Sequence, residues 1–210
     1  MPAWFINSGG LYRQAREAST RASLGGPKAQ SEALIAVVFA FMTLEAFINE
    51  LADFANENPP DSSLAAFGSL INDLNDSRGA SISMRFQFAR WILSKEPFDK
   101  GGQPYQDFQL LIKLRNTIIH RPPNRALVGL AESSTDSLKF LETLRQKGLT
   151  REHHGATASF LAEISTPEMA SWACDTTAAM VRSILEVLPA PDLPGVSVPI
   201  RFLFAKEFGL

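Results

Sequence analysis

The sequence predicts an all-α protein, and three observations lead to this class. Long stretches carry apolar residues at helical spacing, proline and glycine separate these stretches, and no segment shows a persuasive set of alternating strands. With 210 residues, 45% hydrophobic and 20% charged, the chain is long enough to bury a core and too apolar for a disordered protein. We therefore expect a helical bundle over residues 1–188, followed by a proline-rich linker and C-terminal arm over residues 189–210.

The central helix of this bundle is predicted from Ser31 to Asn56, with Ser31 as its cap and Asn58-Pro59-Pro60 as its stop. The segment is apolar almost all round, which is typical of a helix surrounded by others. Glu45 is a carboxylate on an apolar face of this helix, with Asn49 one turn further on. Because a carboxylate in such a place needs a partner, we expect Glu45 to form a structural ion pair rather than to act as a catalytic acid.

The remaining elements follow from periodicity and from breaking residues. Helices are expected over residues 11–23, 61–77, 81–94, 104–121, 136–147 and 167–188, with Thr166 capping the last one and Pro167 at its first position. For residues 81–94, alternation in part of the segment leaves a strand as the less favoured alternative. Within residues 81–94, we expect Phe88 and Trp91 to pack in the core; the alternative is that they stack nucleic-acid bases beside Arg85 and Arg90. Residues 196–210 are expected to form a short extended arm that packs on the body or on a partner.

Charge and cysteine content restrict the function classes. The net charge of −2 gives no global basic field, so any binding of nucleic acid has to come from a local patch. Cys174 is the single cysteine, which excludes an intrachain disulfide, and we expect it to be a buried structural thiol. The start of the chain lacks the pattern of a signal peptide, and the longest apolar run, residues 33–42, is shorter than a membrane span. These features favour a soluble cytoplasmic protein without a membrane partner.

One stretch points to a specific function, residues 107–123 with the sequence DFQLLIKLRNTIIHRPP. It predicts a helix that ends in Arg-Asn-Thr-Ile-Ile-His and is stopped by Pro122-Pro123. Side chains three and four residues apart share one face of a helix. That spacing places four polar residues in one stripe: Lys113, Asn116, Thr117 and His120.

Arg115 lies off this stripe, on the apolar side between the directions of Ile118 and Ile119. An arginine there needs a carboxylate, a path to solvent or a place at an interface. Glu45 is the candidate within the chain, and the sequence leaves open whether the partner is Glu45, a second subunit or both.

Arginine and histidine together suit phosphodiester chemistry without a metal. A guanidinium group grips a phosphate with two hydrogen bonds and stabilises charge that builds in the transition state. An imidazole exchanges a proton near neutral pH, so His120 fits a general base or acid. Asn116, one turn earlier, is placed to orient that ring or to contact the phosphate. RNA supplies its own nucleophile in the 2′-hydroxyl.

The segment LRNTIIHRPP resembles the RX4-6H motif of HEPN domains in its Arg-Asn-x3-His form, and FMTLEAFINELADF resembles their long helix. The resemblance spans residues 30–188, but these two segments alone carry it. It implies a helical bundle that forms a homodimer, with the two motifs meeting in a cleft at the interface. It also implies a metal-independent endoribonuclease without cofactors, acting on RNA as a toxin or antiviral-defence effector with an antitoxin or defence-system partner.

By this resemblance Arg115 and His120 are catalytic and Asn116 assists them, while Glu45, Asn49, Thr117 and Lys113 support the site. The chain also departs from the family. Some HEPN toxins carry a tyrosine two residues after the histidine, where this chain has Pro122, so regulation through that tyrosine is not expected. Residues 136–159 and the proline-rich tail match nothing in the family.

Two alternatives to the ribonuclease remain open on the sequence. The chain could keep the HEPN fold as a non-catalytic module that binds RNA or a partner protein, or it could be an unrelated helical domain in which His120 only favours the helix dipole. A metal site is not expected at His153-His154, since adjacent histidines point apart and no spaced third ligand follows.

Overall fold

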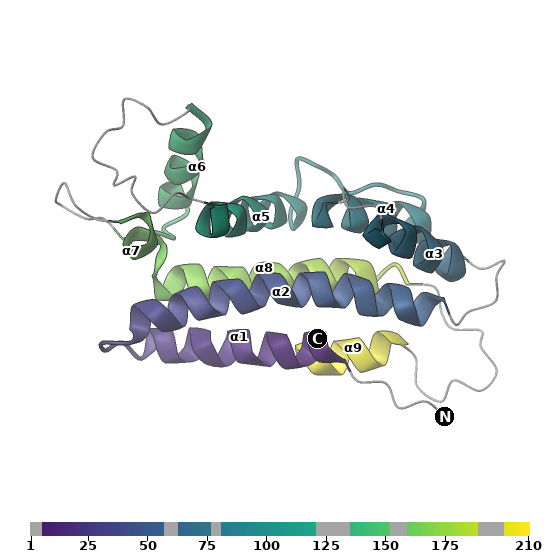
Figure 1. Cartoon of the computed structure of the whole chain (residues 1–210), viewed down its shortest axis with the longest axis horizontal. Coiled ribbons are helices and arrows are strands. Elements are labelled where there is room, and N and C mark those ends of the chain that lie inside the picture. The colour runs from purple at the N-terminus through teal and green to yellow at the C-terminus, as the bar shows by residue number, and fades with distance from the viewer. Residues whose placement is uncertain (1–5, 57–62, 77–80, 121–134, 152–158, 189–199) are drawn as a thin grey trace. The chain divides into compact units, whose positions relative to one another are not determined.

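The computed structural model of the chain describes residues 6–56, 63–76, 81–120, 135–151, 159–188 and 200–210. Over these ranges it contains nine helices and no strand, which confirms the all-α class (Figure 1). The helices are α1 (Asn7–Ser23), α2 (Ala29–Ala55), α3 (Ser63–Asp76), α4 (Ile82–Ser94), α5 (Tyr105–His120), α6 (Thr135–Gln146), α7 (Phe160–Ile164), α8 (Pro167–Leu185) and α9 (Ile200–Phe208).

The helices belong to two compact units. Unit 1 comprises Met1–Arg13, Met42–Gln109 and Thr176–Leu210, and unit 2 comprises Gln14–Phe41 and Leu110–Asp175. Four helices, α1, α2, α5 and α8, contribute residues to both units. The two units are described separately below.

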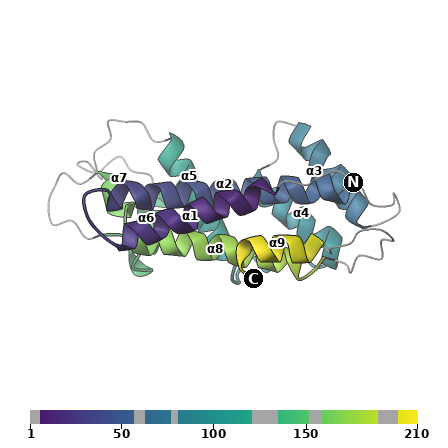
Figure 2. The same cartoon turned by 90° about the horizontal axis from the view of Figure 1, so that it is seen from below.

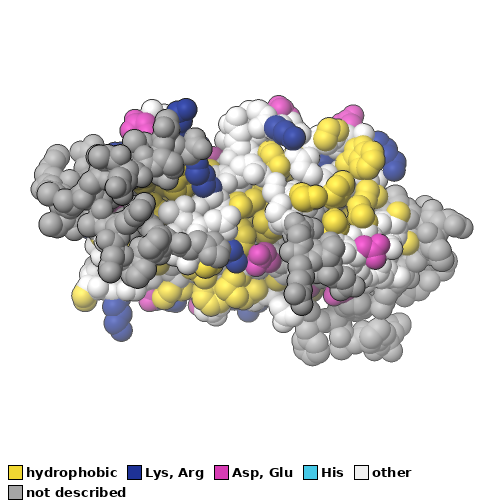
Figure 3. All heavy atoms as spheres, turned by 45° about the horizontal axis from the view of Figure 1, so that its top comes forward, with side chains coloured by type: hydrophobic (Ala, Val, Ile, Leu, Met, Phe, Trp, Pro, Cys, Tyr) yellow, Lys and Arg dark blue, Asp and Glu magenta, His cyan; other side chains and the backbone are white. Residues whose placement is uncertain are grey.

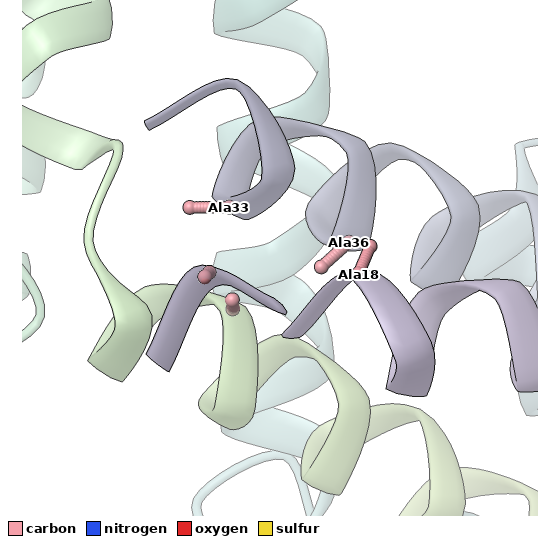
Figure 4. Packing of buried hydrophobic residues seen from close by; sticks show 5 residues of the cluster. Ala18, Ala33 and Ala36 are labelled. Atoms are coloured by element: carbon pink, nitrogen blue, oxygen red, sulfur yellow. The ribbon is translucent and has the colours of Figure 1, made fainter. Parts of the chain in front are cut away.

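Small side chains let three helices of unit 2 approach one another. Ala18 and Ala22 of α1, Ala33 and Ala36 of α2, and Ala170 of α8 form one cluster with no exposed surface (Figure 4). A methyl group fills little space, so neighbouring backbones come close without leaving a void. This packing holds the first part of α2. The part of α2 that belongs to unit 2 ends at Phe41.

Aromatic rings form the core of unit 1. Phe47 of α2 lies 6.3 Å from Phe86 of α4 and 5.1 Å from Phe204 of α9, measured between ring centroids. Phe86 also lies 4.9 Å from Phe108 of α5. Aromatic pairs at these distances add stabilisation beyond the burial of their area. These ring contacts connect four helices: α2, α4, α5 and α9.

The predicted cap of α8 is confirmed, while that of α2 is wrong. Thr166 Oγ1 accepts a hydrogen bond from the Met169 amide at 3.0 Å, and Pro167 is the first residue of α8. In contrast, α2 begins at Ala29, so Ser31 lies inside its first turn. The glycine-rich turn before α2 already starts the helical hydrogen bonding, because the Ala29 amide donates to the Gly26 carbonyl.

The C-terminal segment forms a helix over residues 200–208, so the expectation of an extended arm is wrong there. α9 lies beside the first part of α1 within unit 1 (Figures 1 and 2). Phe208 of α9 contacts Tyr12 with 4.9 Å between ring centroids, and Glu207 pairs with Arg13 at 3.2 Å. Buried aromatic residues therefore make α9 part of the core of unit 1. Residues 189–199, which include the predicted linker, lie outside the described residues.

The expected core packing of α4 is wrong for Trp91, whose side chain is 55% exposed. Ser81 caps the helix by accepting from the Met84 amide, and Phe86 rather than Trp91 is its largest fully buried residue. Phe88 is half-buried. Hydrophobic side chains gather on the surface over the end of the structure that carries α3 and α4 (Figure 3).

Among the helices that the structure describes, α2 is the one that is long and apolar enough to cross a membrane by length and composition. Half of its most apolar window is buried within the structure, and the core helix of a soluble protein passes the same test. The finding is weak evidence for a membrane span.

Candidate functional site

The C-terminal half of α5 carries the candidate site, and its described side chains follow the two predicted faces in part, since Ile119, predicted on the apolar side, is 54% exposed. Leu111 and Leu114 are fully buried in unit 2. On the other side, Lys113 and Asn116 are exposed and Thr117 is half-buried. The Thr117 hydroxyl donates to the Lys113 carbonyl at 2.8 Å, so it is engaged by the helix backbone. The exposed stripe therefore carries the ammonium group of Lys113 and the amide of Asn116.

Arg115 is held by two neighbours in unit 2. The central carbon of its guanidinium lies 5.0 Å from the ring centroid of Phe41, which is 3% exposed. Its Nη1 donates to Asn116 Oδ1 at 3.2 Å. A cation over an aromatic face is attracted by the negative charge of the ring face, and a planar guanidinium also stacks well there. The ring and the amide together restrict the direction of the guanidinium, and the Arg115 side chain remains half-buried.

The sequence predicts Arg115 on the apolar side of the helix, and in the structure its guanidinium lies over the ring of Phe41. Nothing in the sequence around Arg115 identifies Phe41, although Phe41 opens the segment that resembles the long HEPN helix. Glu45 belongs to unit 1 and Arg115 to unit 2, so their ion pair stays a prediction. Glu45 itself is half-buried.

Asn49 has a structural contact that the sequence did not reveal. Its Oδ1 accepts a hydrogen bond from Arg85 Nη1 of α4 at 3.0 Å, and both residues are half-buried in unit 1. The bond ties α2 to α4. Asn49 therefore stabilises unit 1, and a role in supporting Arg115 stays a prediction.

Lys113 connects the polar stripe to α6. Its Nζ lies 5.1 Å from the ring centroid of Phe140, a buried residue of α6. This contact places α6 beside the C-terminal half of α5 (Figure 1). Lys113 was predicted as a supporting residue of the motif, and its contact with a second helix is a new finding.

His120 is the last residue of α5. Its side chain lies outside the described part of the structure, as do His153 and His154. At 3.6 residues per turn, the helix places His120 one turn after Asn116. Among the side chains that are described, no three histidine, cysteine, aspartate or glutamate residues come together in a group that could hold a metal ion.

Cys174 is buried, as the sequence predicts. Burial raises the pKa of its thiol from 9.0 to about 12, while nearby Arg16 lowers the pKa and Asp175 raises it. The thiolate is therefore disfavoured at neutral pH, and Cys174 is unsuited to act as a nucleophile.

Comparison with known proteins gives no match: no family model, no curated protein and no solved structure matches this chain. The resemblance to HEPN domains consequently depends on the two segments that carry it, residues 41–54 and 114–123.

Proposed function

We propose that this protein is a metal-independent endoribonuclease of the HEPN type. One observation carries the proposal: a guanidinium, held by Phe41 and Asn116, lies in the last turns of an apolar helix beside an exposed polar stripe. A guanidinium fixed in advance loses little freedom when it binds a phosphate, so it is suited to stabilise the transition state of cleavage.

In the proposed reaction His120 takes the proton of the RNA 2′-hydroxyl. The 2′-oxygen attacks the adjacent phosphorus, the bond from phosphorus to the 5′-oxygen breaks, and a proton is returned to that leaving oxygen. The products are a 2′,3′-cyclic phosphate and a 5′-hydroxyl end. Arg115 neutralises the charge on the phosphate, and Asn116 orients the guanidinium through the hydrogen bond at 3.2 Å.

We further propose that two copies form a homodimer with a composite site. Three large apolar side chains of unit 2 are exposed on the motif helix or on the helix of Phe41: Ile119 on α5, and Ile35 and Val38 on α2. An apolar patch that such side chains form together would favour burial against another protein surface. A cytoplasmic toxin or defence effector, with an antitoxin or defence partner, is proposed from the resemblance alone.

The test is cleavage of RNA in the presence of EDTA. Wild-type protein is expected to cut single-stranded RNA, to leave 2′,3′-cyclic phosphate ends, and to lose this activity when every 2′-hydroxyl is methylated. Arg115→Ala and His120→Ala are expected to abolish cleavage. Lys28→Ala, which changes an exposed cation in the turn before α2, is the control and is expected to cleave at the wild-type rate.

Absence of cleavage on every RNA offered, together with binding that neither substitution changes, would contradict the proposal. That result would favour the non-catalytic module. Cleavage that requires an added metal ion would also exclude the proposed mechanism.

A further inference from the structure

Basic side chains gather around α5 and α6 in unit 2. The described side chains of residues 110–119 and 139–164 include six basic and two acidic groups, in a chain whose net charge is −2. The basic residues are Lys113, Arg115, Lys139, Arg145, Lys147 and Arg151, and the acidic ones are Glu142 and Glu163. We call this set the α5–α6 cationic surface.

Both carboxylates of this surface are engaged by neighbours. Glu142 accepts a hydrogen bond from Gln146 Nε2 at 3.1 Å. Glu163 is buried, and one of its oxygens lies 3.5 Å from Arg145 Nη2. The buried carboxylate partly neutralises Arg145, whereas the Lys139 side chain is exposed.

The surface contains a hollow along α6. Its lining comprises Lys139, Glu142, Thr143, Arg145 and Gln146. Three donors of the hollow already have partners: the Thr143 hydroxyl donates to the Lys139 carbonyl at 2.8 Å, Gln146 Nε2 donates to Glu142, and Arg145 pairs with Glu163. The exposed Lys139 ammonium is a group of the kind that contacts phosphates in nucleic-acid complexes.

Lys113 connects the motif helix to α6, the helix that lines the hollow. The Lys113 ammonium lies over the ring of Phe140, and Phe140 follows Lys139 directly in α6. On α5, Lys113 precedes Asn116 by three residues, which is a rise of about 4.5 Å along the helix. Basic groups therefore continue from the motif helix onto α6 within one unit.

We propose that the α5–α6 cationic surface binds the phosphate backbone of single-stranded RNA on one side of the scissile phosphate, with Lys139 and Lys113 as phosphate contacts. The inference rests on the proposed ribonuclease function and adds the path of the substrate. Such contacts position the strand and carry no sequence information, because phosphates are the same in every RNA. Since the whole chain is slightly acidic, this local surface supplies the attraction that the net charge does not.

Binding can be measured apart from cleavage with a labelled single-stranded RNA of mixed sequence that is 2′-O-methylated throughout. Lys139→Glu is the test variant, and Lys28→Glu, with the same charge change at another exposed lysine of unit 2, is its matched control. Both side chains are exposed, so neither substitution is expected to unfold the protein; thermal melting checks this.

Lys139→Glu is expected to weaken RNA binding severalfold and to lower the slope of log K against log salt by about 0.7, the value for one lost phosphate contact on a single strand. Lys28→Glu is expected to leave both quantities unchanged. Equal weakening by the two variants, or no change in either, would overturn the inference.

The two proposals fail in different ways. If Arg115→Ala abolishes cleavage while Lys139→Glu binds like wild type, the ribonuclease stands and the α5–α6 cationic surface is not its RNA path. If wild-type protein binds no methylated RNA even at low salt, the RNA path is overturned. If binding follows the expected pattern and no RNA is ever cut, the surface stands and the catalytic function fails.

Discussion

Arg115 combines a charge with a fixed direction, and the two contributions can be separated. Arg115→Lys keeps the charge but removes the planar group that lies over Phe41 and donates to Asn116. We expect the rate of RNA cleavage to fall by about 10²–10³-fold, the usual effect of removing one fixed donor from a site of this kind. The thermal midpoint is expected to change little, because Arg115 is only half-buried. A lysine variant that cleaves at the wild-type rate would show that charge alone is sufficient.

Cys174 provides a pH-dependent prediction. The folded chain holds the thiol neutral up to about pH 12, whereas an unperturbed thiol ionises near 9.0. Below pH 9 the group is neutral in both states and its contribution to stability is fully present; it is lost as pH rises from 9 toward 12. We expect the free energy of unfolding to fall more steeply over this range for the wild type than for Cys174→Ala, which denaturant titrations at several pH values measure.

The same residue is expected to resist labelling. A thiol reagent at pH 8 is predicted to modify Cys174 far more slowly in the native protein than in urea, because both burial and the raised pKa suppress the reactive thiolate. Equal rates in the two conditions would show that the thiol is accessible in the folded state.

At the residue scale, the sequence predicts the side of a helix on which a residue lies better than it predicts the residues that it contacts. Helical phase correctly separates the exposed Lys113 and Asn116 from the buried Leu111 and Leu114. It also places Arg115 away from the polar stripe. The ring of Phe41 could not be predicted as its neighbour, because that contact depends on how two helices distant in sequence pack together.

At the element scale, hydrogen bonds of Thr166 stabilise the start of α8, and their contribution can be measured. Thr166 Oγ1 accepts from the Met169 amide at 3.0 Å and donates to the Leu149 carbonyl at 2.8 Å. Thr166→Ala removes both bonds in a buried place and is expected to cost about 1–2 kcal/mol of stability. Thr166→Ser keeps the hydroxyl and is the control, with a smaller loss. Denaturant unfolding measures both; an alanine variant as stable as wild type would show that the cap contributes nothing.

The two sides of α4 are expected to respond very differently to truncation. Phe86 is fully buried between Phe47 and Phe108, so Phe86→Ala is expected to destabilise the protein by about 3–5 kcal/mol. Trp91 is 55% exposed, and Trp91→Ala is expected to change stability by less than about 0.5 kcal/mol. Chemical denaturation of both variants provides the comparison. A large loss for Trp91→Ala would restore the core position that the sequence had predicted for it.

The elements that the sequence predicts well are long or have clear stop signals. α2, α5 and α8 combine apolar periodicity with proline or a cap, and periodicity needs no knowledge of the fold. In contrast, α7 has five residues, too few for a periodic pattern that would predict it. α9 follows several prolines, and its helical state depends on burying Phe204 and Phe208 against Phe47 and Tyr12, which are distant in sequence.

At the scale of the whole molecule, the distribution of charge matters more than its sum. The net charge of −2 correctly excludes a global basic field, and the sequence therefore required a local patch for any binding of nucleic acid. It could not locate the proposed patch, because the contact of Lys113 with Phe140 depends on how α5 and α6 pack together. RNA binding that depends on such a patch is expected to weaken strongly with salt.

The proposed composite site makes a prediction that only the assembled molecule can satisfy. If Arg115 of one copy acts with His120 of the other, Arg115→Ala and His120→Ala proteins are each inactive. After mixing and subunit exchange, however, a heterodimer contains one site with both residues intact. We expect cleavage to reappear in the mixture, to a fraction of the wild-type rate, and the native mass to be twice 23.0 kDa by light scattering. Exchange is followed with differently labelled copies, so that a lack of mixing is recognised. If the mixture exchanges fully and stays inactive, Arg115 and His120 of the same copy act in one site. The composite arrangement would then be wrong, while the ribonuclease activity could still stand.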